Sequence, residues 1–264
     1  MPKVLLEHRA RITILTVNRP EVHNCVDGET AGALAEAIQG FERDGAARVL
    51  VITGAGEQAF CSGADLKSER SLLEHPWLDR AGPLGFARLD PSKPTIAAVN
   101  GYCFAGGMEL AAWCDFRIAG ANAEFGALNR RWGVPFIDGG TQRFARIVGQ
   151  GNALYLVETG MRIDARRALA MGFVQEVVPA GQALSRALAL AERIAGYPWT
   201  SVVADRAATL ATFGLSLRDG LRLEAGTCLP AVFDPEMAAG LRRFASGDRP
   251  EAPRPPRGGD DGEP

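Results

Sequence analysis

Apolar and polar positions along the first half of the chain repeat with the periods of strands and helices. Residues 12–18 form a short β-branched run that ends at Arg19-Pro20, which is typical of a strand. Apolar side chains in residues 30–41 recur at the i, i+3, i+4, i+7 spacing of an amphipathic helix. Residues 49–53 are apolar throughout, as in a strand buried on both faces. This succession of strand, helix and strand predicts an α/β fold with a parallel sheet.

The same pattern returns once and then gives way to helices. Residues 95–100 and 116–119 are apolar enough to be strands, and residues 107–113 between them are predicted to be a helix. After Thr141 the spacing predicts mainly helices, with one short strand near residues 173–177. The helices are expected at residues 142–149, 152–158, 165–171, 180–194 and 201–212.

These elements predict three regions along the chain. Residues 1–190 are expected to form an α/β core, and residues 191–245 a C-terminal helical region. Residues 246–264 are rich in proline, glycine and charge, with almost nothing to bury, so we predict a disordered tail there.

Composition narrows the classes of function. Of the 264 residues 47% are apolar, enough for a large core, and the 29 basic side chains are nearly balanced by 31 acidic ones, for a net charge of −2. Such a chain has no basic field for nucleic acid or an anionic membrane. We find no secretory signal and no apolar run of membrane-spanning length, and expect a cytoplasmic protein. The five cysteines form no CxxC pair, so neither a metal site nor a disulfide framework is expected.

Two segments rich in small residues follow predicted buried strands, at residues 54–67 and 100–110. Small residues let backbone N–H groups approach a ligand closely, and the second segment opens a helix whose dipole favours negative charge. Two such N–H groups can hold a thioester oxygen as it becomes an enolate. Glycine loops alone are also typical of ordinary turns. Residues 54–59 match a dinucleotide fingerprint, but no helix opens directly after them.

Four strings occur in order along the chain: NRPEVHN at residues 18–24, AFCSGADLK at 59–67, AAVNGYCFAGGMELAAWCDFRIAG at 97–120 and GVPFIDGGTQRFARIVG at 133–149. Together they resemble the crotonase (enoyl-CoA hydratase/isomerase) superfamily. The resemblance implies a crotonase-like spiral of repeated strand-strand-helix turns with a C-terminal helical region. It also implies a homotrimer or dimer of trimers that acts on acyl-CoA in fatty acid metabolism, with coenzyme A as part of the substrate and no separate cofactor.

The resemblance also assigns binding residues. The two oxyanion donors fall on the backbone N–H groups of Ala64 and Gly106. Trp132 and Phe136 are candidates for an acyl pocket, although aromatic residues are as often plain core. The positions that match the family's coenzyme A contacts are Asn24, Cys25, Val26, Ser62, Asp65 and Leu66.

The acid and base residues depart from the hydratase pattern. Glu109 matches the first catalytic glutamate and lies one helical turn after Gly106. Asn129 stands where the second glutamate is expected, and an amide cannot exchange protons. We therefore expect Glu109 and Asp138 to form the carboxylate pair, with Asn129 hydrogen-bonded to water or substrate. Asp138 could instead cap a helix that begins near Gly140.

The sequence thus predicts an enoyl-CoA hydratase that acts through an enolate. The lost second glutamate leaves a Δ3,Δ2-enoyl-CoA isomerase as the main alternative, because that reaction needs only one carboxylate. Thioester hydrolysis or decarboxylation on the same scaffold, and a non-catalytic acyl-CoA-binding protein, stay open as well. The net charge argues against an RNA-binding relative.

Overall fold

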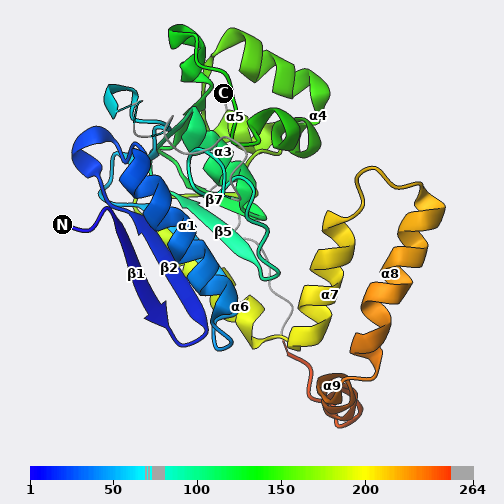
Figure 1. The fold of residues 1–264 in the computed structure, drawn as a ribbon. Coiled ribbons are helices and arrows are strands. Elements are labelled where there is room, and N and C mark those ends of the chain that lie inside the picture. The colour runs from blue at the N-terminus through cyan, green and yellow to red at the C-terminus, as the bar shows by residue number, and fades with distance from the viewer. Residues whose placement is uncertain (69, 71, 73–80, 251–264) are drawn as a thin grey trace, which may run out of the picture. The chain divides into compact units, whose positions relative to one another are not determined.

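The computed structural model describes residues 1–68, 70, 72 and 81–250 (Figure 1). The chain divides into two compact units, Met1–Tyr197 and Pro198–Pro264. The boundary expected at residue 190 would fall inside a helix that packs on the sheet, and the first unit extends past the end of that helix. Most of the tail predicted at residues 246–264 lies outside the described residues, since only residues 246–250 are described.

The main sheet of the first unit has six strands in the order β1-β2-β3-β5-β7-β10. β1 is antiparallel to β2, and the other neighbours are parallel. The register places Leu15, Ile52 and Ala97 side by side. The strands are β1 (Val4–Arg9), β2 (Ile12–Val17), β3 (Val49–Gly54), β5 (Thr95–Val99), β7 (Phe116–Gly120) and β10 (Glu176–Val178).

Helices cover both faces of this sheet, which explains the continuous apolar run in β3. Leu50 and Ile52 belong to the core cluster that includes residues of α1 (Gly28–Arg43). Val49 and Val51 point the other way, into a cluster with α6 (Ala183–Gly196). Because successive side chains of a strand point to opposite faces and both faces are covered, every residue of β3 is buried.

A second sheet of four short strands lies beside the first, in the order β4-β6-β8-β9. β4 follows β3, β6 follows β5 and β8 follows β7, so each turn of the chain contributes a strand to both sheets. After β6 comes α3 (Gly106–Trp113), which completes a strand-strand-helix turn. This confirms the fold class expected from the resemblance. The strands are β4 (Ala59–Cys61), β6 (Tyr102–Phe104), β8 (Glu124–Gly126) and β9 (Arg162–Asp164).

The remaining elements of the first unit surround this framework. Three short 3₁₀ helices are η1 (Pro20–Val22), η2 (Leu66–Ser68) and η3 (Leu128–Trp132). The helices predicted at residues 142–149 and 152–158 form one element, α4 (Gly140–Thr159), with non-helical backbone at Gly149. Gly149 has a φ of 76°, which kinks the element where the sequence predicted a break. The last helix before β10 is α5 (Ala165–Ala170).

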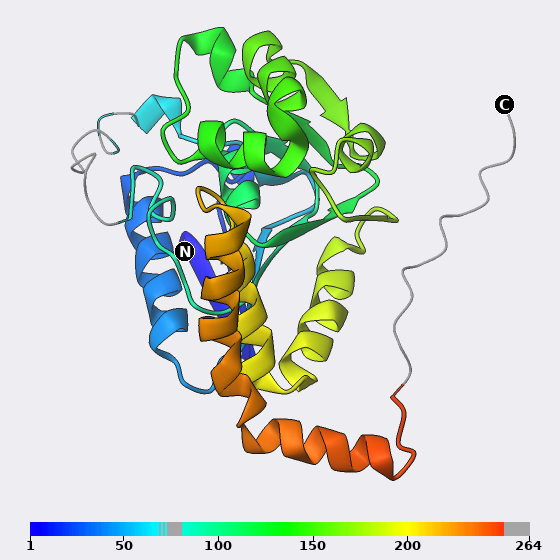
Figure 2. The same ribbon diagram turned by 90° about the vertical axis from the view of Figure 1, so that its right-hand side faces the viewer.

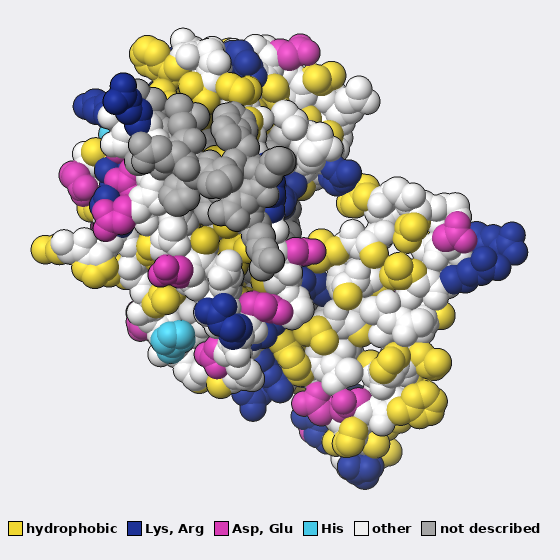
Figure 3. Space-filling model, in the orientation of Figure 1, with side chains coloured by type: hydrophobic (Ala, Val, Ile, Leu, Met, Phe, Trp, Pro, Cys, Tyr) yellow, Lys and Arg dark blue, Asp and Glu magenta, His cyan; other side chains and the backbone are white. Residues whose placement is uncertain are grey.

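The second unit is helical, with α7 (Trp199–Leu210), α8 (Leu217–Val232) and α9 (Pro235–Ala245) (Figure 2). α7 packs against α8, and Thr200 Oγ1 donates to Asp234, the residue that caps α9. Apolar side chains are exposed over this unit (Figure 3). They include Leu217, Leu221, Leu229, Phe233, Leu241 and Phe244. Within the part of the chain that is described, no helix has the length and apolarity needed to cross a membrane.

Arg117 is a buried cation at the centre of the first unit. It lies on β7 and is 3% exposed. Its guanidinium donates to the carbonyls of Phe173 (2.6 Å) and Cys114 (3.0 Å), and it lies over the Phe173 ring. Cys114 is the C-cap of α3, so the charge sits where the helix dipole is negative. Arg117 therefore joins α3 to the turn before β10.

We expect Arg117→Met to lower the free energy of unfolding by about 2–4 kcal/mol, because two buried carbonyls would lose their donor. Arg9→Met removes an exposed ion pair with Glu7 and should change stability by less than about 1 kcal/mol. Urea unfolding of both variants and the wild type measures the difference. Equal midpoints for the two variants would contradict a structural role of Arg117.

Candidate active site

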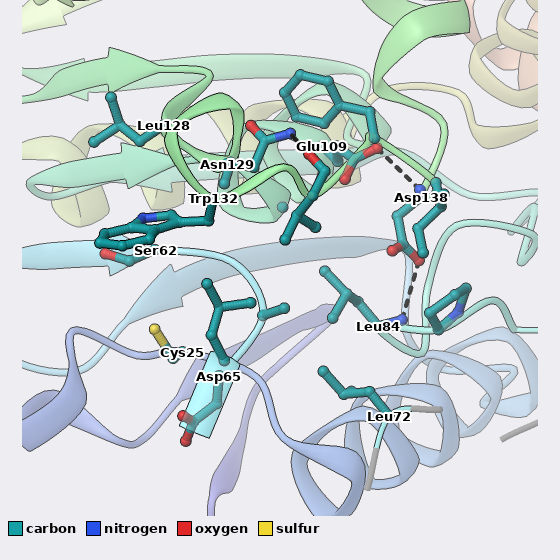
Figure 4. A pocket seen from close by; sticks show the side chains of 18 of the residues that line it. Cys25, Ser62, Asp65, Leu72, Leu84, Glu109, Leu128, Asn129, Trp132 and Asp138 are labelled. Carbon is teal, nitrogen blue, oxygen red and sulfur yellow. Dashed lines mark hydrogen bonds between the residues drawn. The ribbon is translucent and has the colours of Figure 1, made fainter. Parts of the chain in front are cut away.

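A cavity of about 750 Å³ opens beside the N-terminus of α3 (Figure 4). Its walls come from the loops after β2 and β4, the segment before β5, α3, and the segment that runs from η3 to α4. Most residues singled out in the sequence line it. They are Cys25, Ser62, Ala64, Asp65, Leu66, Gly106, Glu109, Asn129, Trp132, Phe136 and Asp138.

Asn24 and Val26 do not line the cavity but hold its wall. Asn24 Nδ2 donates to the carbonyls of Ala55 (3.0 Å) and Ala59 (2.7 Å), which ties the loop after β2 to the end of β3. Val26 pairs with Ala64 in an isolated parallel bridge, in which Val26 N donates to the Gly63 carbonyl. These bonds fix the backbone around Ala64.

The segments that carry Ala64 and Gly106 approach each other closely. A Cβ placed on Gly63 would lie 2.6 Å from Gly106 N, and one placed on Gly106 would lie 3.7 Å from Ala64 N. Gly63 also has a φ of 89°, so both space and backbone conformation require glycine there. Neither Ala64 N–H nor Gly106 N–H donates a hydrogen bond to another described residue. Two unpaired donors therefore meet at the cavity wall.

Ala105, directly before Gly106, has an unusual backbone conformation, with φ 50° and ψ −122°. Such strain persists only where the surroundings impose it. Here Ala105 N–H donates to the Gly126 carbonyl at 2.9 Å, and the Ala105 carbonyl accepts from Met108 and Glu109 N–H groups. These bonds hold the turn that directs the Gly106 N–H out of the helix.

Glu109 lies on α3, all of whose residues are buried, and it is itself 3% exposed. Its Oε1 accepts from the backbone N–H groups of Asp138 (2.9 Å) and Gly140 (2.8 Å) (Figure 4). A Cβ on Gly140 would lie 3.0 Å from that oxygen, so glycine leaves room for the contact. Oε2 accepts no hydrogen bond from the described residues. One carboxyl oxygen is thus held in place by the backbone, and the other has no hydrogen-bond donor among the described residues.

Asp138 is held in the same way, next to Glu109. It is 1% exposed, and its Oδ1 accepts from the Leu84 backbone N–H at 3.0 Å (Figure 4). It does not cap α4, since the N-cap is Gly139 and no side chain caps that helix. The alternative of a helix cap is therefore wrong. Nothing in the sequence indicated Leu84, because the group that donates to Asp138 is the Leu84 backbone N–H, in a segment that matches no motif.

The environment raises the pKa of both carboxyl groups. Burial, and then the nearby Asp138 charge, raise the pKa of Glu109 to about 8. Burial raises the pKa of Asp138 to about 6, against the opposing effects of the Leu84 N–H and of the Arg88 and Arg143 charges. At neutral pH Glu109 is accordingly mostly protonated and Asp138 mostly ionised.

Asn129 lines the cavity, but its amide is bonded to the backbone of the chain. Its Nδ2 donates to the Val134 carbonyl at 2.8 Å, and its Oδ1 is buried with no partner among the described residues. Because a carbonyl acceptor requires an N–H donor, this bond fixes the orientation of the amide. Asn129 stabilises the segment between η3 and α4, and its expected contact with water or substrate stays a prediction.

The mouth of the cavity carries the other predicted binding residues. Trp132 is 71% exposed and lines the cavity, as Ser62 does (Figure 4). Phe136 is buried and packs edge-on against Phe144, so it belongs to both the wall and the core. Asp65 turns away from the cavity to pair with Arg19 at 2.9 Å. Among the described residues no group of histidine, cysteine or carboxylate side chains is placed to hold a metal.

The thiol of Cys25 also lines the cavity. Burial, and then the nearby Asp65 charge, raise its pKa to about 11. At neutral pH it is a protonated thiol and a poor nucleophile.

We expect Glu109→Gln to stabilise the protein increasingly as the pH rises from 5 to 8. The folded-state pKa of Glu109 lies near 8 against an ordinary 4.5, so the folded wild type loses stability as the pH rises through this window. Glutamine cannot ionise and can still accept both backbone N–H bonds. Melting temperatures across this pH range should diverge, whereas parallel curves would contradict the raised pKa.

Comparisons with known proteins agree with this geometry. The sequence model of the family described as enoyl-CoA hydratase/isomerase matches residues 7–250. The short-chain-enoyl-CoA hydratase of Clostridium acetobutylicum is 37% identical over 194 residues, which cover 72% of this chain and 74% of that protein. The carnitinyl-CoA dehydratase of Salmonella arizonae is 37% identical over 254 residues, 93% of this chain and 96% of that protein.

A solved structure shows the same fold. The crystal structure of the enoyl-CoA hydratase EchA1 from Mycobacterium marinum matches with a TM-score of 0.88 and 34% identity. The match covers 95% of this chain and 98% of that one. The extent of these matches leaves one conclusion: this chain belongs to the enoyl-CoA hydratase/isomerase family.

Proposed function

We propose that this protein is an enoyl-CoA hydratase, which adds water across the double bond of a 2-enoyl thioester of coenzyme A. The observation that carries the proposal is that two unpaired backbone N–H groups and two buried carboxyl groups line one cavity. Relatives named as hydratases, at 35–37% identity, support the same reaction. Coenzyme A enters this proposal as part of the substrate.

The N–H groups of Ala64 and Gly106 would bind the thioester oxygen. When water adds to C3, negative charge develops on that oxygen as the enolate forms. Donors that are already in place stabilise this charge without reorganising, and loss of one such donor typically costs about 10²- to 10³-fold in rate. The N-terminal position of Gly106 on α3 adds the favourable end of the helix dipole.

The two carboxyl groups divide the proton transfers. Asp138, ionised at neutral pH, accepts a proton from the attacking water as its oxygen bonds to C3. Glu109, protonated at neutral pH, gives its proton to C2 as the enolate collapses. The proton left on Asp138 then returns to Glu109 through solvent, so the protein ends unchanged. Two neighbouring carboxyl groups with separated pKa values support this division of roles.

The assembly and location also remain proposals. Exposed apolar side chains on α8 and α9 support self-association, and we propose the homotrimer or dimer of trimers implied by the family resemblance. We further propose that coenzyme A lies along the mouth formed by Cys25, Ser62 and Leu66. A cytoplasmic role in fatty acid metabolism would fit such a substrate.

One observation favours a Δ3,Δ2-enoyl-CoA isomerase as the second candidate. The amide of Asn129 stands where a second glutamate is expected, and it is turned onto the Val134 carbonyl. An isomerase moves one proton between carbons and needs a single carboxyl group at the reacting atoms. Under that alternative Glu109 alone would carry the proton.

Product masses separate the two reactions. We expect a mixture of 2-enoyl- and 3-enoyl-CoA thioesters, incubated with the protein in heavy water, to gain the mass of one heavy-water molecule at the expense of the 2-enoyl form. Mass spectrometry of the thioesters reads the gain directly. Double-bond migration with hydrogen exchange alone would reject hydration and establish the isomerase.

The pH dependence of kcat/KM tests the assigned roles. We expect a rise near pH 6 as Asp138 ionises and a fall near pH 8 as Glu109 loses its proton. Asp138→Asn should lower kcat/KM by roughly 10²- to 10⁴-fold and remove the acidic limb. Glu36→Gln, which changes an exposed carboxylate on α1, is the matched control. An acidic limb that survives in Asp138→Asn would exclude Asp138 as the base.

A further inference from the structure

Arg143 lies in the first turn of α4, where an arginine is electrostatically out of place. The N-terminus of a helix carries partial positive charge, so a cation there is unfavourable. Arg143 is also half-buried, which removes part of its hydration, and this burial lowers the pKa of its guanidinium from the ordinary value. An arginine in this position requires compensating interactions.

Those interactions are two hydrogen bonds to different segments of the chain. Arg143 Nη1 donates to the Asp138 carbonyl at 3.1 Å, and Nη2 donates to the Ala87 carbonyl at 2.8 Å. Gly139 leaves the space for the guanidinium, because a Cβ there would lie 2.0 Å from Nη1. Its φ of 96° also favours glycine. The sequence around Arg143 is thus shaped to bring the guanidinium onto these carbonyls.

The same two segments hold the carboxylates of the cavity. Residues 138–140 supply both N–H donors to Glu109, and Leu84, three residues before Ala87, supplies the donor to Asp138. The two hydrogen bonds of Arg143, called here the Arg143 bridge, join residues 84–87 to residues 138–140. The Asp138–Leu84 bond joins the same two segments at a second point. Arg143 itself is not among the residues that line the cavity.

We infer that Arg143 is a positioning residue: its guanidinium holds residues 84–87 and 138–140 together, and so aligns Glu109 and Asp138 without contacting the substrate. This inference deepens the proposed function and rests on it for the effect on turnover. The alignment itself is a property of the free protein and can be measured without turnover.

The charge of Arg143 gives this role a distinct signature. It lowers the pKa of both Glu109 and Asp138, against the larger effect of burial. The other charged or titratable groups around these sites are Arg88, which faces Asp138, and Asp90 and Cys114, which face Arg143. Removing the guanidinium should therefore raise the pKa of both carboxyl groups, while Arg88 continues to act on Asp138 alone.

Three variants of the full chain separate the bridge from the charge. Arg143→Met removes both, and Arg143→Lys keeps the charge but cannot reach two carbonyls in the geometry of the planar fork. Arg146→Met, an exposed arginine on the same helix, is the matched control. Steady-state hydration of crotonyl-CoA between pH 5 and 9 gives kcat and KM for each protein, together with the acidic and basic limbs of its pH profile.

We expect kcat to fall on the order of 10²-fold in Arg143→Met and Arg143→Lys, because misalignment of catalytic groups is costly, with KM within about threefold of the wild type. Both limbs should move to higher pH in Arg143→Met and stay in place in Arg143→Lys. Arg146→Met should match the wild type throughout. A rise in KM alone, or limbs that stay in place in Arg143→Met, would overturn the inference.

A second measurement uses no substrate. The stability difference between the parent and its Glu109→Gln variant, followed by melting temperature against pH, reports the ionisation of Glu109. We expect its midpoint to lie at higher pH with methionine at position 143 than with arginine. An unmoved midpoint would overturn the inference, whereas a moved midpoint in a protein that hydrates no enoyl-CoA would retain it and reject the proposed function.

Discussion

The close approach of two backbone segments at Gly63 and Gly106 is the constraint on which the rest of the site depends. No side chain fits between them, since a Cβ on Gly63 would reach within 2.6 Å of Gly106 N. The approach follows from the second sheet, in which β4 and β6 are parallel neighbours and each ends two residues before one of these glycines. Two sheets built from consecutive strands thus bring two chain turns together at the cavity wall.

Burial raises the pKa of both carboxyl groups. Hydrogen bonds from backbone N–H groups limit the free energy that this burial costs. A carboxylate with no partner in an apolar interior is strongly disfavoured. Glu109 and Asp138 are held by main-chain donors from segments that also form the cavity wall. The result is a pair with raised but different pKa values, instead of an ion pair with two permanently charged members. The same segments therefore determine both the position and the protonation state of each group.

The sequence predicted five of the six strands of the main sheet, without β1, and most of its candidate site residues line one cavity, but it could not predict the contacts that hold them. β3 and α1 have clear periodicity, while β4, β6, β8 and β9 have three residues each, too few to show a period. Glu109 was identified by the resemblance, as the match to the family's first catalytic glutamate one helical turn after Gly106. The bond from Leu84 to Asp138 and the bridge made by Arg143 link positions more than 50 residues apart, and the atoms involved are mostly main-chain atoms. Such contacts leave no pattern in residue types.

The two backbone N–H bonds to Glu109 have a consequence for how this active site can diversify. The donors are peptide groups, so an exchange of the side chain at position 138 leaves them in place if the backbone is kept, whereas position 140 has no room for a Cβ beside Glu109. The glutamate can therefore remain anchored while a neighbouring position such as Asn129 changes its chemical character. Side chains around the cavity can therefore vary one at a time, because the groups that hold Glu109 are set by the path of the chain.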